Sequence, residues 1–93
     1  MNDPYAAAWA KIEAAILRAP GSLDPAIRAA IACGDDPEEL APLLDKVRRH
    51  AYRIVDRDVA GLDEDVAFEA ILAAALGAAD ERRRAALAAL ERA

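Results

Sequence analysis

The residues of this chain with the greatest capacity for chemistry are His50, its only histidine, and Cys33, its only cysteine. Lys46 precedes His50 by one helical turn, so both side chains share a face of any helix that contains them. An imidazole and an amine placed together can exchange protons with a small carbonyl compound. A single cysteine supplies neither a disulfide framework nor a cysteine-only metal site. We therefore expect no metal or cofactor. The chemistry that remains for His50 is acid–base catalysis.

The charges around His50 argue against a nucleic-acid site. The basic residues of the stretch "LLDKVRRHAYR" alternate along the chain with Asp45, Asp56 and Asp58, and no aromatic platform accompanies them. The net charge of −5 disfavours DNA, RNA and anionic membranes, since binding to phosphates needs cations. The longest nearly uncharged run, residues 66–79, is too short to cross a bilayer. We expect a cytoplasmic protein with no nucleic-acid or membrane partner.

The composition predicts the elements that must position these residues. More than a quarter of the chain is alanine and β-branched residues are few, which is typical of an all-α fold. Prolines, glycines and aspartates divide the chain into helices expected at residues 4–19, 24–33, 42–55, 56–61 and from 63 onward. The last helix is either continuous or bent at Gly77. We expect residues 1–93 to form one domain, a compact bundle of four to five helices.

The helix expected at residues 42–55 determines where His50 points. Its apolar stripe follows the spacing i, i+4, i+7 and i+11 and consists of Leu43, Val47, His50 and Ile54. This phase predicts that His50 faces the core. On the other side, Asp45 and Arg49 are expected to form a weak exposed ion pair.

Three stretches of the chain carry a family resemblance. They are "LDPAIRAAI", "DKVRRHAYRIVDRDVAGL" and "DEDVAFEAILAAALGAADERRRAAL". Over residues 23–90 the chain resembles the carboxymuconolactone decarboxylase-like and alkylhydroperoxidase D-like all-helical proteins, and residues 1–19 lie outside the resemblance. It implies an alkylhydroperoxidase D-like bundle.

The resemblance also implies where peroxidase chemistry would lie in this chain. Peroxidase members carry Cys-x-x-Cys with a histidine four residues after the second cysteine, and an upstream glutamate. With His50 in the place of that histidine, the cysteine positions hold Leu43 and Lys46, and the glutamate position falls near Ala29. We therefore expect no thiol peroxidase activity. Cys33 precedes two acids at an expected helix end, which disfavours a thiolate, and we interpret it as a buried structural residue.

Glu69 completes the candidate site. It lies beside the apolar stripe of the last helix, and the helix packing implied by the resemblance brings it towards Lys46 and His50. In one interpretation these three residues catalyse a lyase or isomerase reaction on a small organic acid, in a pocket shared with Tyr52 and Trp9. In the other, which we favour, they form a buried polar network that satisfies His50 and sets the helix register.

The last helix also predicts assembly. Between residues 66 and 79 the only charged side chain is Glu69, so almost the whole circumference of this helix is apolar. A domain of this size has few helices to cover it, and alanines together with Gly77 permit close helix contacts. We therefore predict a homo-oligomer that works mainly by binding copies of itself or a protein partner, with the cysteine-independent enzyme as the alternative.

Overall fold

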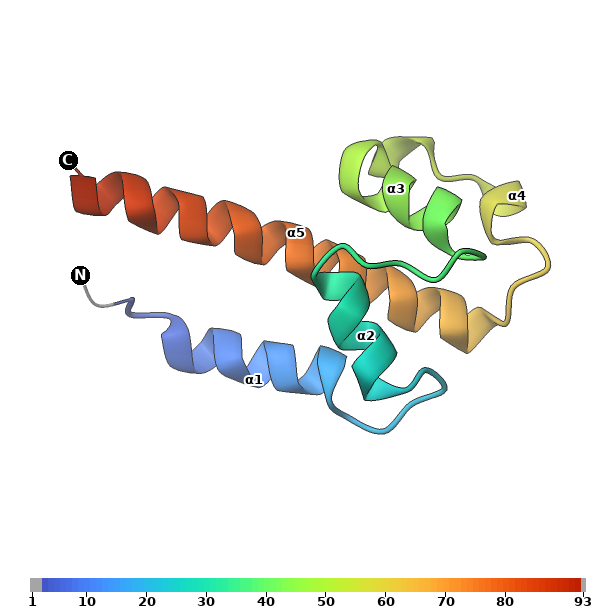
Figure 1. The fold of residues 1–93 in the computed structure, drawn as a ribbon, viewed down its shortest axis with the longest axis horizontal. Coiled ribbons are helices and arrows are strands. Elements are labelled where there is room, and N and C mark those ends of the chain that lie inside the picture. The colour runs from blue at the N-terminus through green and yellow to red at the C-terminus, as the bar shows by residue number, and fades with distance from the viewer. Residues whose placement is uncertain (1–2, 93) are drawn as a thin grey trace.

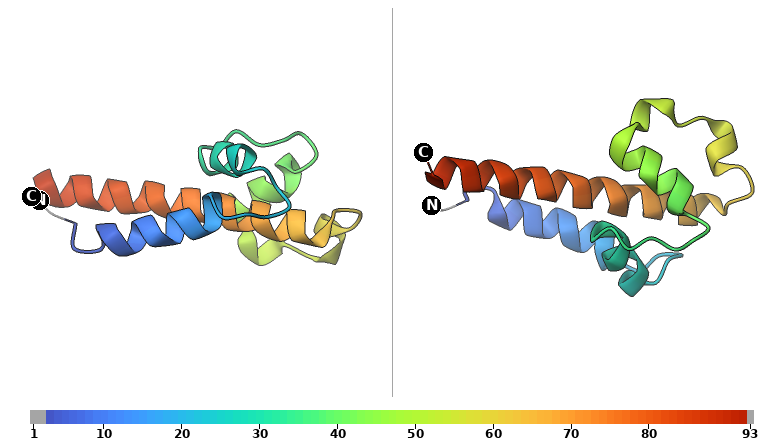
Figure 2. Two further views of the ribbon diagram at one scale, coloured as in Figure 1. Left: turned by 90° about the horizontal axis from the view of Figure 1, so that it is seen from below. Right: turned by 45° about the horizontal axis from the view of Figure 1, so that its top comes forward.

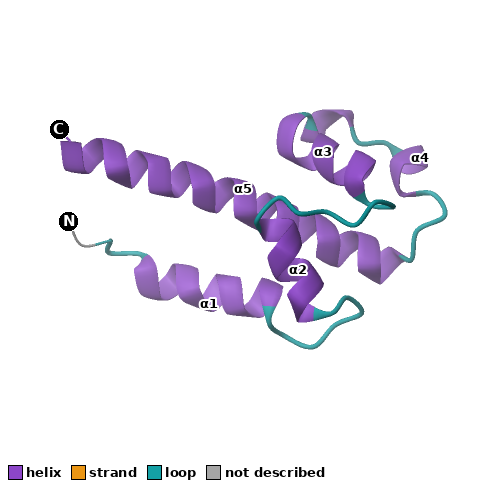
Figure 3. Cartoon of the chain, in the orientation of Figure 1, coloured by secondary structure: helices purple, strands orange, loops and turns teal. Residues whose placement is uncertain are grey.

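The computed structural model describes residues 3–92, and every regular element in this range is a helix (Figures 1 and 3). The elements in chain order are α1 (Ala6–Leu17), α2 (Pro25–Ala32), α3 (Ala41–Arg49), the 3₁₀ turn η1 (Ala51–Arg53), α4 (Asp56–Val59) and α5 (Glu64–Arg92). The predicted all-α fold is confirmed. No helix within residues 3–92 is long and apolar enough to cross a membrane.

Helix α5 is the spine of the molecule. Its 29 residues run along the longest dimension of the protein, which is 47 Å. Helices α1, α2 and α3 all pack against it. Figures 1 and 2 show α1 running antiparallel beside the C-terminal half of α5, while α2 and α3 lie against its N-terminal half. Helix α5 therefore holds the other three long helices in place.

Local signals in the sequence explain where α2 begins and ends and where α5 begins. Asp24 caps α2, because its carboxylate accepts a hydrogen bond from the Ala26 amide at 2.8 Å. Gly34 follows α2 with a φ of 92°, a left-handed conformation that favours glycine. At the start of α5, the Asp63 carboxylate accepts a hydrogen bond from the Val66 amide at 3.0 Å. These boundaries agree with the predicted helices to within a residue or two.

The core lies where α2 and α3 meet the N-terminal half of α5. Its largest fully buried side chains are Ile31 and Leu44. At Gly77, α5 touches the backbone of α2 directly, since a Cβ there would lie 2.1 Å from the Ala32 carbonyl oxygen. Helix α5 continues through Gly77, so of the two expected forms of the last helix the continuous one is found.

The third helix is shorter than predicted. It ends at Arg49, and His50 has φ −144° and ψ 50°, which is not helical. Basic residues fill the last turn, where the helix dipole favours them, and the β-branched Ile54 and Val55 are extended. The predicted continuation to residue 55 is wrong, because the chain turns through η1 and α4 instead.

Candidate functional site

His50 is exposed, so its predicted inward orientation is wrong. The prediction assumed helical phase, and that phase ends one residue earlier, at Arg49. The imidazole approaches the ring of Tyr52 edge-on, with the centroids 6.0 Å apart. Tyr52 is itself exposed. The two rings therefore lie together at the surface.

Lys46 forms an ion pair with α4. Its Nζ donates to Oδ1 of Asp58 at 2.7 Å, and Oδ2 of the same carboxylate accepts from the Val55 amide at 2.9 Å. The hydrogen bond from Lys46, followed by that from the Val55 backbone, lowers the pKa of Asp58 below its ordinary value. Lys46 thus ties α3 to the segment that follows η1.

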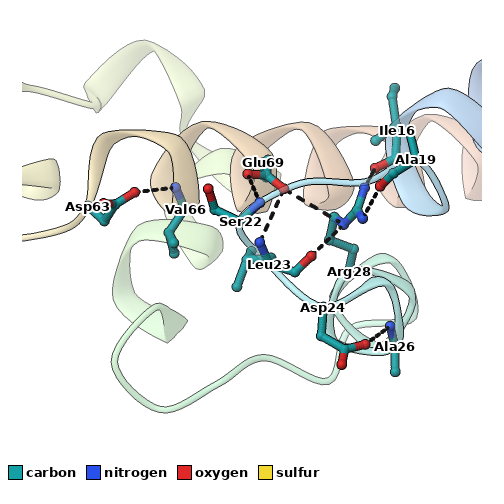
Figure 4. A network of polar contacts seen from close by, with 10 residues as sticks. All are labelled: Ile16, Ala19, Ser22, Leu23, Asp24, Ala26, Arg28, Asp63, Val66 and Glu69. Atoms are coloured by element: carbon teal, nitrogen blue, oxygen red, sulfur yellow. Dashed lines mark hydrogen bonds and ion pairs between the residues drawn. The ribbon is translucent and has the colours of Figure 1, made fainter.

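Glu69 binds the loop between α1 and α2 (Figure 4). Its carboxylate accepts hydrogen bonds from the amides of Ser22 at 2.9 Å and Leu23 at 3.2 Å, and lies 3.9 Å from Nε of Arg28. A Cβ on Gly21 would lie 2.1 Å from a Glu69 oxygen, so glycine leaves the room that the carboxylate occupies. Glu69 therefore anchors this loop to α5.

Arg28 is the residue that the sequence analysis missed. Only 2% of it is exposed, and its guanidinium donates to the carbonyl oxygens of Leu23 at 3.2 Å, of Ile16 at 2.8 Å and of Ala19 (Figure 4). The end of α1, the loop and the start of α2 thus meet at one buried cation. An arginine within the apolar segment "PAIRAAIA", on the same face as Ile31, was the available signal.

A second arginine, on α3, binds the loop between α2 and α3. Arg48 binds both carboxylate oxygens of Asp36 at 2.6 Å, and its Nη2 also donates to the Ile31 carbonyl at 2.8 Å. The hydrogen bonds to Asp36 raise the pKa of Arg48. Like Arg28, this side chain holds a loop against the core.

The candidate residues are thus dispersed. Within residues 3–92 no side-chain hydrogen bond or ion pair joins any two of His50, Lys46 and Glu69, and each side chain has different neighbours. The same part of the chain holds no group of three histidine, cysteine, aspartate or glutamate side chains arranged to bind a metal. These polar side chains form hydrogen bonds with backbone amides and carbonyls, and they hold the loops in place.

A groove of about 740 Å³ lies between α1, α2 and α5. Trp9 and Cys33 line it together with charged residues that include Arg82, and with the small and apolar residues Leu17, Ala29, Ala32, Leu76, Gly77 and Ala78. Cys33 is exposed, so its predicted burial is wrong, because α2 ends one residue before it. His50, Lys46, Glu69 and Tyr52 do not line the groove.

One side of α5 remains uncovered. Phe68 is 62% exposed there, and exposed or half-buried residues continue in line with it along the helix. We define the open face of α5 by the six residues Asp65, Phe68, Leu72, Ala75, Ala79 and Arg82. By contrast, Ala70, Ala73 and Ala74 are buried against α2 and α3. The sequence predicts that residues 66–79 are covered on most sides, whereas in the structure the open face of α5 is left uncovered.

Comparison of the chain with protein-family models, curated proteins and solved structures gives no match. The resemblance to the carboxymuconolactone decarboxylase-like proteins stays a prediction from the sequence.

Proposed function

We propose that this chain is a helical assembly module that pairs with a second copy of itself through the open face of α5. The exposure of that face is the observation that carries the proposal. Three helices pack on α5, yet Phe68 remains 62% exposed, in line with Leu72, Ala75 and Ala79. Apolar side chains aligned along a helix gain stability when a second apolar surface covers them.

A second copy is the simplest partner for such a face. A two-fold contact places the same face on both chains and closes the assembly at two. The alanines let the two helices approach closely, and Phe68 and Leu72 supply larger apolar area. Gly77 takes no part, because α2 of the same chain already occupies its free side.

The arrangement of the polar residues favours assembly over the lyase or isomerase alternative. That reaction needs a pocket into which His50 and Glu69 both project. The Glu69 carboxylate is instead occupied by the amides of Ser22 and Leu23, and His50 faces solvent. We also infer no peroxidase role, since the positions that the family resemblance assigns to the redox cysteines hold Leu43 and Lys46.

Light scattering at micromolar concentration tests the proposal. We expect the mass of two chains for the wild type and of one chain for Phe68→Glu, because a carboxylate in the contact must be desolvated. Tyr52→Glu is the matched control, since it introduces the same charge at an exposed aromatic residue outside the open face. Circular dichroism verifies that both variants fold. A wild-type mass of one chain, unchanged with concentration, would remove the proposal.

A further inference from the structure

The six residues of the open face have the spacing of a coiled-coil seam. From Asp65 to Arg82 the intervals alternate between three and four residues without interruption. This alternation keeps a stripe facing a partner helix over its whole length. Between Asp65 and Arg82, which carry opposite charges, the four positions are apolar, and beyond Arg82 the exposed Ala86 and Leu90 continue the line. The pattern of side-chain size and charge along the seam therefore distinguishes an antiparallel from a parallel pair of helices.

We propose that two copies pair antiparallel through this seam. The two-fold axis passes through the midpoint of the seam, at the height of Ala73 and Ala74 along α5. The inference rests on the proposed self-assembly and adds its direction and register. Asp65 and Arg82 lie equally far from the midpoint of the seam on opposite sides. In the antiparallel pair, Asp65 of each chain consequently faces Arg82 of the other.

The charges at the two ends of the seam support this register. The side chains of Asp65 and Arg82 are both exposed, Arg82 at the edge of the groove, and within residues 3–92 neither side chain has a hydrogen bond or ion pair. Neighbouring arginines on α5 differ, because Arg83 and Arg84 both bind Asp80 of the same helix. The antiparallel pair gives the two unpaired charges opposite partners, whereas a parallel pair places like charges together.

Side-chain size supports the same register. Centred on that midpoint, Phe68 faces Ala79 of the second copy, and Leu72 faces Ala75. Each large side chain therefore meets a small one, which lets two helices interlock at close distance. A parallel pair in register would place Phe68 against Phe68 and leave the alanines opposite one another. Large residues would separate the helices at one end while small ones left a gap at the other.

Disulfide trapping distinguishes the two directions. In a Cys33→Ser chain, which has no other thiol, we would mix Asp65→Cys protein with Arg82→Cys protein and oxidise mildly. The antiparallel pair should give a disulfide-linked heterodimer. Ala79→Cys alone is the matched control, because its two copies should lie about 16 Å apart along the axis, beyond disulfide reach. A parallel pair would reverse both results and overturn the register while leaving the proposed assembly intact.

A charge exchange tests the end pairs without cross-linking. Arg82→Glu should raise the dissociation constant of the dimer about tenfold or more, since two attractive pairs become repulsive. Asp65→Arg together with Arg82→Glu should restore it to within about threefold of the wild type. Lys11→Glu, an equal change of charge at an exposed site on α1, should leave it unchanged. Wild-type affinity in the single Arg82→Glu variant would overturn the antiparallel register, whereas a monomeric wild type would overturn the assembly itself.

Discussion

The two sides of α5 differ in where their polar groups find partners. On the covered side, Glu69 binds the amides of Ser22 and Leu23, and Arg28 binds three carbonyl groups. On the open face, Asp65 has no partner within the part of the chain that the structure describes. The covered side is complete within one chain, and the open face is not. The difference separates residues that fold this protein from residues available to bind another molecule.

The small residues of α5 also differ between its covered side and its open face. Gly77 is small because the Ala32 carbonyl of α2 lies against it. Ala75 and Ala79 are exposed, so within residues 3–92 no close packing accounts for their small size. Substitutions on either side should therefore have effects of different size and kind.

The largest effect is expected at the covered side, from Arg28→Ala. Three carbonyl groups lose their donor and Glu69 loses its cation, so the free energy of unfolding should fall by about 3 kcal/mol. Urea denaturation followed by circular dichroism measures it. Arg53→Ala, at an exposed arginine, should change it by less than about 0.5 kcal/mol. Equal losses in the two variants would mean that Arg28 is not the buried junction described.

Gly77→Ala should come next. Alanine favours a helix over glycine by about 1 kcal/mol, yet here its Cβ meets the Ala32 carbonyl oxygen. Because backbone must move to admit it, we expect a net loss of about 1–3 kcal/mol. Ala85→Gly, on an exposed part of α5 outside the open face, should cost only the propensity difference. A stabilised Gly77→Ala variant would show that α2 and α5 are not in direct contact.

A smaller, pH-dependent effect is expected for Lys46→Met. The folded pKa of Asp58 lies below its ordinary value of 3.8, so the pair with Lys46 contributes stability above that value. The contribution is lost as the pH falls through the folded pKa. The difference in stability between the wild type and Lys46→Met should therefore be present near neutral pH and vanish in acid. Arg49→Met, which removes an exposed ion pair with Asp45, sets the scale of an ordinary surface change.

The smallest effect is expected from His50→Ala. An exposed imidazole that only approaches Tyr52 should change the free energy of unfolding by less than about 0.5 kcal/mol. Thermal melts of both proteins at one concentration provide the measurement. A loss of several degrees would place His50 in the core after all, as its position in the sequence pattern predicts.

The sequence by itself determined the helices and most of their boundaries. Alanine content, the cap at Asp24, the left-handed Gly34 and the acidic start of α5 act within a few residues, so their effects can be read locally. The candidate site could not be read in this way. His50 was placed inward by a helical phase that ends at Arg49. The turn that follows is held by the pair between Lys46 and Asp58, which lie 12 residues apart, and the helical pattern does not show this pair.

Tertiary structure alone decided the partners of the charged residues. Glu69 is 46 and 47 residues away from the two amides that it binds, and no local pattern joins such distant groups. The same is true of the open face. The sequence makes residues 66–79 apolar on nearly every side, and only the positions of α1, α2 and α3 determine which side remains exposed. Helix formation depends on neighbouring residues, whereas burial and pairing depend on segments that meet only after the chain has folded.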